Sequence, residues 1–276
     1  MLEKKAEAIR ETIVEMLVAA GSGHTAGPLG MADIFAAFYF HILKHDPKNP
    51  DWEERDRLIL SNGHTVPVRY AAMAHAGYFP IKECLTLRKF GSRLQGHPER
   101  LRLPGLETTS GPLGEGLSQV AGMAYAFRMD GRKNRVYVVT GDGELDEGQN
   151  WEAIMWAGKQ KLSNLAAVID RNNIQIDGVT EDVMPLESLR AKYEAFNWHV
   201  LETNGNDIRA FVAAVEEAKA ITERPVAIIA HTIPGKGVPE IEFDYRWHGK
   251  TPSKEEGKRF LKELRTLGGR VPHEYA

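Results

Sequence analysis

The sequence predicts an α/β protein with a mostly parallel sheet and helices on both faces. From residue 135 onwards, short apolar runs alternate with longer stretches of helical periodicity, which is the pattern of parallel strands joined by crossover helices. Glycine and polar residues follow several of these runs, at the sheet edge where ligands bind in such folds. The chain has 276 residues, 42% of them apolar and 26% charged, so it can bury a full core.

The first half of the chain is mainly helical. Residues 3–19 place Ile9, Ile13, Met16 and Leu17 at helical spacing, and the glycines at 21 and 23 end this helix. Further helices are predicted for Met31–His41, Val66–His75, Ile81–Phe90 and Gly114–Met129, and a strand for Arg57–Leu60. Residues 91–114 form an irregular loop that is long for a compact domain, and long ordered loops are usually functional.

The second half supplies most of the sheet. Strands are predicted at 135–140, 164–170, 198–202 and 225–231, and helices at 148–160, 186–195 and 207–220. A surface helix is predicted at about 253–266. This alternation predicts a single α/β domain.

Composition limits the function classes. The net charge is −3 with both signs interspersed, which favours neither a nucleic-acid nor a membrane partner. The single cysteine, Cys84, excludes an internal disulfide and a cysteine-based zinc site, and it is expected to be a small buried residue. No secretory leader or apolar segment long enough to span a bilayer is visible, so the sequence predicts a cytoplasmic protein.

Two predicted strand ends bring oxygen ligands to one place. Asp142 follows the apolar run 136–140 within Gly141-Asp142-Gly143, and Asn172 follows the run 165–169. Neighbouring parallel strands end at the same edge of a sheet, and Mg²⁺ prefers oxygen ligands of this kind. Each motif alone is ordinary turn chemistry, but the pair favours a magnesium and phosphate site.

Four histidines lie beside glycines in predicted loops: His24, His64, His97 and His248. Neutral imidazoles around a sugar or diphosphate can donate, accept and shuttle protons. The alternatives are silent surface histidines or a zinc site, although no zinc-binding spacing is present. The segment Gly111–Gly116 opens a helix and leaves backbone N–H groups available to an anion. Motifs typical of dinucleotide-binding proteins, P-loop nucleotidases and α/β-hydrolases are absent.

The segments 141–148 and 169–178 resemble the thiamine diphosphate signature of transketolases. Other transketolase segments are matched in order by Gly23-His24, Gly27–Ala32, Leu60–His64, Gly96–Glu99, Gly105–Gly114 and His248-Gly249. The resemblance implies that residues 1–276 form one domain of the thiamine diphosphate-binding fold, of the diphosphate-binding type.

The resemblance also implies roles for individual residues. Asp142, Asn172 and the carbonyl of Ile174 would hold Mg²⁺, with Ca²⁺ or Mn²⁺ as possible substitutes. His64 and His248 would contact the diphosphate and the substrate edge, and His24 and His97 would bind the hydroxyls of the ketose. Gly143 would donate its N–H to a phosphate. The implied cofactor-binding set comprises His64, Gly111, Pro112, Leu113, Gly141, Asp142, Gly143, Glu144, Asn172, Ile174 and His248. Lys236 is either a residue that helps to close the site or an exposed loop lysine.

Transketolase chains carry two further domains, and this chain stops near the end of the first. In the family, the glutamate that activates the cofactor and most groups that bind sugar phosphate lie in the second domain. The resemblance therefore implies the N-terminal subunit of a split transketolase. It would need a separate C-terminal subunit with the pyrimidine-binding domain, in a two-fold α2β2 assembly.

The implied reaction moves a two-carbon ketol unit from a ketose phosphate to an aldose phosphate, as in the pentose phosphate pathway. Thr25 after His24, and Val66–Arg69 after His64, depart from the usual transketolase pattern near the substrate side. Two alternatives remain: the α-type subunit of another thiamine diphosphate enzyme, such as a 2-oxoacid dehydrogenase or a deoxyxylulose-phosphate-type synthase, and a non-catalytic interaction module.

Overall fold

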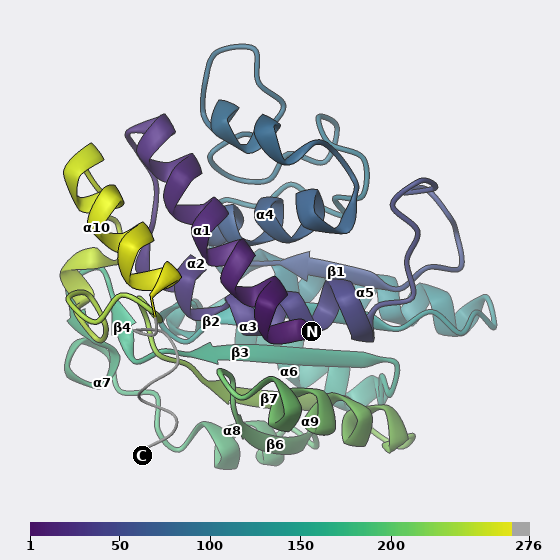
Figure 1. The fold of residues 1–276 in the computed structure, drawn as a ribbon. Helices are drawn as coiled ribbons and strands as arrows, with labels where there is room; N and C mark the ends of the chain where they lie inside the picture. Colours follow the sequence, from purple (N-terminus) through teal and green to yellow (C-terminus); the bar gives the residue numbers. More distant parts are fainter. Residues whose placement is uncertain (267–276) are drawn as a thin grey trace.

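The computed structural model describes residues 1–266, and a five-stranded parallel sheet lies at its centre (Figure 1). The strands follow the order β1-β2-β3-β7-β6. Their bounds are Arg57–Leu60 for β1, Val136–Gly141 for β2, Leu165–Arg171 for β3, His199–Asn204 for β6 and Val226–His231 for β7. The register sets Gly141 of β2 beside Asp170 of β3. The predicted fold class is confirmed.

Helices cover both faces of the sheet, and two apolar clusters separate the layers. Successive residues of β2 alternate between them: Tyr137 and Val139 belong to one cluster, Val136 and Val138 to the other. This alternation is expected because side chains of a strand point to opposite faces. The first face carries α1 (Leu2–Ala20), α2 (Ala26–Gly30), α3 (Ala32–Ala37), α4 (Val66–Ala76) and α9 (Ile208–Ala220). The second carries α5 (Glu115–Met129), α6 (Gly148–Gln160) and α8 (Leu189–Ala195).

A crevice at the carboxyl ends of β1 and β2 follows from this layering. The chain leaves β1 through a short 3₁₀ turn, Gly63–Thr65, into α4 on the first face. It leaves β2 through another 3₁₀ turn, Gly143–Asp146, into α6 on the second face. Neighbouring strands whose connections diverge to opposite faces leave an opening between them, which is where ligands bind in open α/β sheets.

Several elements differ from the sequence prediction. The helix predicted at Met31–His41 is divided into α3 and a π-helical turn, Phe38–Ile42, and is preceded by the separate short helix α2. The helix predicted at Ile81–Phe90 is wrong beyond Thr86: only a 3₁₀ turn forms over Ile81–Thr86, because Arg88 adopts a left-handed backbone with φ of 59°.

The region after β3 also differs. The antiparallel hairpin of β4 (Ile174–Gln175) and β5 (Gly178–Val179) was not predicted, and neither was α7 (Thr180–Val183). The helix predicted at 186–195 begins at Leu189, since the Ser188 side chain accepts a hydrogen bond from the N–H of Ala191 at 3.3 Å.

The last described helix is α10 (Lys254–Arg265), which begins with a capping box formed by Ser253 and Glu256. It packs beside α1 (Figure 1). Cys84 is buried, as predicted. Within residues 1–266, no helix has the length and apolar character needed to cross a membrane.

Candidate functional site

A cavity lies in the crevice at the carboxyl ends of β1, β2 and β3. It brings together most of the predicted site residues, namely His24, His64, Leu113, Gly141, Asp142, Gly143, Glu144, Asn172, Ile174 and His248. Sequence reasoning gave no role to its other lining residues, which are Gly27, Pro28, Asn62, Thr65, Gln175 and Ile176. Asn62 and Thr65 lie in the loop and the 3₁₀ turn that follow β1, so the strand-end rule that identified Asp142 could also have found them.

His97, Gly111 and Pro112 do not line this cavity. His97 and Gly111 are neighbours, since a Cβ added to Gly111 would lie 4.0 Å from Cγ of His97. The charge of His97 contributes to the lowered pKa of His24, which places the two imidazoles within electrostatic reach. His97 therefore belongs to the wider surroundings of the cavity.

The Asp142 carboxylate is held in a fixed position and is 1% exposed. Its Oδ1 accepts a hydrogen bond from the N–H of Gly143 at 2.8 Å, and Oδ2 accepts one from the N–H of Asn173 at 2.8 Å. Arg171 Nη1 lies 3.1 Å from Oδ2. Burial raises the pKa of Asp142, and the Arg171 guanidinium opposes that shift. The Gly143 N–H, which was predicted to donate to a phosphate, is used by this carboxylate.

Asn172 is fixed by its own hydrogen bonds. Its Nδ2 donates to Asp170 at 2.8 Å, and its Oδ1 accepts from the N–H of Ile174 at 3.0 Å. Asn173, in a left-handed conformation with φ of 62°, turns the chain so that Ile174 returns toward Asn172. Asp142, Asn172 and Ile174 thus line one cavity, and residues with carboxylate, amide and carbonyl oxygens suit Mg²⁺. Among the described residues, no group of three or more His, Cys, Asp or Glu could hold a metal, so the zinc alternative gains no support.

Three of the predicted histidines form a cluster. The ring centroids of His24 and His64 are 4.7 Å apart, those of His64 and His248 are 5.1 Å apart, and those of His24 and His248 are 5.5 Å apart. Burial lowers the pKa of each, with a further contribution from the neighbouring imidazoles for His24 and His64, and the pKa of His24 falls to about 4. The cluster is therefore neutral at neutral pH.

Two polar atoms among the lining residues are buried without a hydrogen-bond partner in the described part of the chain: Nδ1 of His24 and Oδ1 of Asn62. Buried polar groups are normally satisfied. Together with neutral imidazoles and a fixed oxygen set, these atoms fit a polar ligand that combines a metal-bound phosphate with donors and acceptors nearby.

Arg88 was not identified from the sequence. A Cβ on Gly96 would lie 2.6 Å from Arg88 Nε, and one on Gly23 would lie 4.0 Å from the same atom. Its side chain thus lies against the glycines that precede His97 and His24. The positive charge of Arg88 contributes to the lowered pKa of both histidines, after burial.

Glu144 supports the site from behind. Its Oε1 accepts hydrogen bonds from Oγ of Ser61 and from the N–H of Gly114 at 2.8 Å, and its Oε2 accepts from the N–H of Gly141 at 3.0 Å. The carboxylate joins the end of β1, the end of β2 and the start of α5. Both of its oxygens accept hydrogen bonds within the protein, so Glu144 holds these three segments together, and its predicted place among the cofactor-binding residues stays a prediction.

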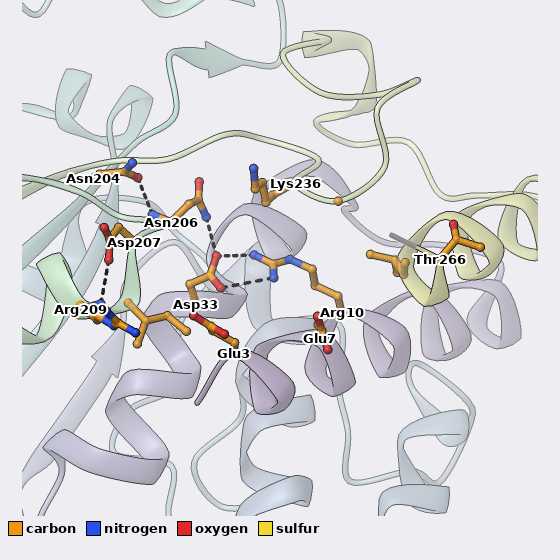
Figure 2. A pocket seen from close by; sticks show the side chains of 13 residues that line it. Glu3, Glu7, Arg10, Asp33, Asn204, Asn206, Asp207, Arg209, Lys236 and Thr266 are labelled. Carbon is orange, nitrogen blue, oxygen red and sulfur yellow. Dashed lines mark hydrogen bonds and ion pairs between the residues drawn. The ribbon is translucent and has the colours of Figure 1, made fainter. Parts of the chain in front are cut away.

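Lys236 does not line this cavity. It is buried and lines a second cavity, where α1, α3 and α10 meet the loops that follow β6 and β7 (Figure 2). The alternative of an exposed loop lysine is wrong, since Lys236 is 5% exposed, and a role in closing the site stays a prediction.

The fold and the site define a cofactor-binding α/β protein, and comparisons with known proteins identify its family. Residues 2–273 match the family model described as transketolase, thiamine diphosphate binding domain. The chain is 43% identical over 267 residues to the 6-deoxy-6-sulfo-D-fructose transketolase subunit SqwG of Clostridium sp. (strain MSTE9), covering 97% of each chain. It is 39% identical over 263 residues to a subunit of the apulose-4-phosphate transketolase of Phocaeicola vulgatus, covering 95% of this chain and 93% of that protein.

Solved structures agree. The transketolase from Leishmania mexicana superposes with a TM-score of 0.90 at 34% identity, over 96% of this chain and 41% of that chain. The present chain thus spans about two fifths of the solved transketolase and nearly all of the two subunits named above. The chain belongs to the transketolase family and contains its thiamine diphosphate-binding domain. The predictions of the family and of a subunit of a two-chain transketolase are confirmed.

Proposed function

We propose that this chain, as one diphosphate-binding domain over residues 1–276, forms the cofactor-anchoring half of a two-chain transketolase. The complete enzyme transfers a two-carbon ketol unit from an anionic ketose to an aldose. The single observation that supports this most strongly is the convergence of Asp142, Asn172 and Ile174 with three histidines in one cavity at the carboxyl edge of the sheet.

The donor set fits Mg²⁺ bound to the diphosphate of thiamine diphosphate. Asp142, Asn172 and the carbonyl of Ile174 would hold the metal, and Mg²⁺ commonly combines one or two protein oxygen ligands with substrate phosphates. When bound, thiamine diphosphate supplies the electron sink for carbon–carbon bond cleavage and formation. The fixed Asp142 and Asn172 side chains orient the diphosphate end.

The histidines handle hydroxyl groups and protons. His64 and His248 lie in the cavity with the oxygen donors, and His24 stands next to both rings. His24 and His97 would hydrogen-bond the ketose hydroxyls. Because burial lowers their pKa, these imidazoles are neutral at pH 7 and can accept a proton as well as donate one.

Substrate and partner follow from the relatives. Their names specify 6-deoxy-6-sulfo-D-fructose and apulose 4-phosphate, both of which carry an anionic group, so we propose an anionic ketose donor for this chain. The relatives are named as subunits, which supports a separate C-terminal subunit with the pyrimidine-binding domain. A two-fold α2β2 assembly would then bring thiamine diphosphate to the contact between the two kinds of chain.

The test combines the purified chain with its complementary subunit, thiamine diphosphate and Mg²⁺. The chain alone should show no ketol transfer, and the mixture should show it. Xylulose 5-phosphate, 6-deoxy-6-sulfo-D-fructose, apulose 4-phosphate and pyruvate are offered in parallel as donors, each together with an aldose phosphate as acceptor. Transfer from one of the three sugars supports the proposal and identifies the donor. Turnover by the chain alone would refute the split site, and consumption of pyruvate only would favour another thiamine diphosphate enzyme.

A further inference from the structure

One side chain that lines the candidate site cavity has no part in the proposed function. Asn62 lies just after β1 and is 2% exposed. Its Oδ1 is buried without a hydrogen-bond partner among residues 1–266, and its Nδ2 makes no hydrogen bond to any of these residues. Buried polar groups are normally satisfied, so a carboxamide with both ends unpaired points to a partner outside the chain.

The other buried asparagines of the described chain differ from Asn62. Each is at most 8% exposed, and the side chain of each donates at least one hydrogen bond within the protein. They are Asn134, Asn150, Asn172 and Asn206. These four amides support the fold. The Asn62 amide makes no hydrogen bond that could do so.

The backbone holds the Asn62 side chain at the cavity. The carbonyl of Asn62 accepts hydrogen bonds from the N–H of Thr65 at 2.9 Å and from Oγ1 of Thr65 at 2.8 Å. The side chain reaches the end of β2, because a Cβ added to Gly141 would lie 3.5 Å from Nδ2 of Asn62. The unpaired amide is therefore placed beside the residue that precedes Asp142, in the cavity that Asp142 also lines.

The chemistry of the amide limits what it can bind. A carboxamide offers an acceptor oxygen and a donor N–H₂ group. An ionised phosphate oxygen only accepts hydrogen bonds, so a diphosphate would leave Oδ1 of Asn62 unpaired. A hydroxyl group, or an amino group beside a ring nitrogen, both donates and accepts and would satisfy both ends of the amide. A ketose carries the first kind of group, and the pyrimidine ring of thiamine diphosphate carries the second.

We propose that Asn62 is a ligand-binding residue of this cavity, and that its carboxamide hydrogen-bonds a neutral group of the ligand that both donates and accepts. This inference rests on the proposed function, because the ligand is the cofactor or the ketose of the two-chain enzyme. Since the amide makes no hydrogen bond within the chain, the free energy lost by burying it is recovered only when the ligand binds.

The stability of the purified chain without cofactor tests the first part of this proposal. Leucine has the branched shape of asparagine without its polar atoms, so Asn62→Leu should unfold at the same temperature as the wild type or at a higher one. The matched control is Asn134→Leu, since Nδ2 of Asn134 donates to the carbonyls of Glu53 and Arg55 at 2.7 Å each. The control should lower Tm by about 4 °C or more. A lowered Tm in Asn62→Leu, or a failure to fold, would refute the proposal, because the amide would then support the fold.

Ligand binding by the complex with the complementary subunit tests the second part. At saturating Mg²⁺, Asn62→Leu should weaken the binding of thiamine diphosphate, measured by calorimetry, or raise the KM for the ketose, in either case about tenfold. Weaker binding of thiamine diphosphate would assign Asn62 to the pyrimidine ring. An unchanged affinity for the cofactor with a raised KM would assign it to a hydroxyl of the ketose. Asn134→Leu should match the wild type in both measurements.

Failure of this role and failure of the proposed function give different results. If the wild-type complex binds thiamine diphosphate and transfers a ketol unit, and Asn62→Leu equals it in cofactor affinity and in KM, the role of Asn62 is refuted and the proposed function stands. If the wild-type complex neither binds the cofactor nor transfers a ketol unit, the proposed function is refuted and the role of Asn62 with it.

Discussion

Replacement of Glu144 tests how the candidate site is held together. This side chain is 3% exposed, and its carboxylate accepts hydrogen bonds from Ser61, Gly114 and Gly141. Glutamine has the same shape but only one acceptor oxygen. Glu144→Gln must therefore turn its amide N–H₂ toward at least one of these three donors.

The expected cost follows from that mismatch. If the amide oxygen keeps Ser61 and Gly114, the N–H₂ group faces the N–H of Gly141, so one hydrogen bond to a charged group is lost and a buried donor is left without a partner. That combination costs about 2 to 3 kcal/mol. Glu144→Ala removes every acceptor and leaves a void, which costs about 4 to 5 kcal/mol.

Urea unfolding at pH 7, followed by the fluorescence of the five tryptophans, measures both values. A cost of about 2 to 3 kcal/mol lowers Tm by roughly 4 to 10 °C for a chain of this size. Glu152→Gln, at an exposed position of α6, is the control and should be neutral. A Glu144→Gln variant as stable as the wild type would refute the reasoning, since it would show that the second acceptor oxygen is not needed.

Three further predictions concern the cavity itself. Asp142→Asn should weaken the Mg²⁺-dependent binding of thiamine diphosphate to the reconstituted enzyme about tenfold or more, as measured by calorimetry. The control Asp177→Asn, on the nearby exposed turn, should bind like the wild type. Equal binding by the two variants would contradict the metal site. His24, whose pKa falls from 6.5 to about 4, binds fewer protons in the folded than in the unfolded chain between these values. The contribution of His24 to stability should therefore be constant above about pH 6.5 and fall by at most about 3 kcal/mol toward pH 4. His24→Asn should flatten this slope in urea unfolding at pH 5 and pH 7, and an unchanged slope would exclude His24 as its source. Arg88→Gln should raise the pKa of His24 and of His97 in an NMR titration, because a nearby positive charge is removed. Arg88→Lys keeps the charge and should leave both pKa values low. Unchanged pKa values in Arg88→Gln would contradict the electrostatic role of Arg88.

Local patterns were sufficient for the elements with strong periodicity. β2, β3 and α6 begin and end within one or two residues of their predicted bounds, because each has an apolar pattern with glycine or polar residues at its ends. The prediction of a helix over Ile81–Phe90 failed for a reason that periodicity cannot show. Arg88 takes a left-handed conformation, and its N–H closes a turn onto the carbonyl of Leu94 at 2.9 Å.

The site was predictable only where chemistry follows a strand end or a recognisable segment. Asp142, Asn172 and the histidines were identified in this way. The supporting role of Glu144 was missed because it depends on Ser61, which lies 83 residues earlier in the chain. Arg88 was missed because its importance comes from lying against Gly23 and Gly96, which only the folded chain brings together. Contacts between distant segments leave no local pattern.

Two buried carboxylates explain why the crevice can present a fixed set of ligands. Glu144 connects β1, β2 and α5. Asp142 connects β2 to the turn after β3, because it accepts a hydrogen bond from the N–H of Asn173 and contacts Arg171. Arg171 also binds Glu181 at 2.6 Å. Burial raises the pKa of both carboxyls, so desolvation opposes their ionised form, and the apolar layers on both faces of the sheet must supply the stability. The hydrogen bonds preorganise the oxygen donors before a ligand binds, which reduces the conformational entropy lost on binding. Such a site can hold the diphosphate end of a cofactor whose ring, in the proposed enzyme, is activated by another polypeptide.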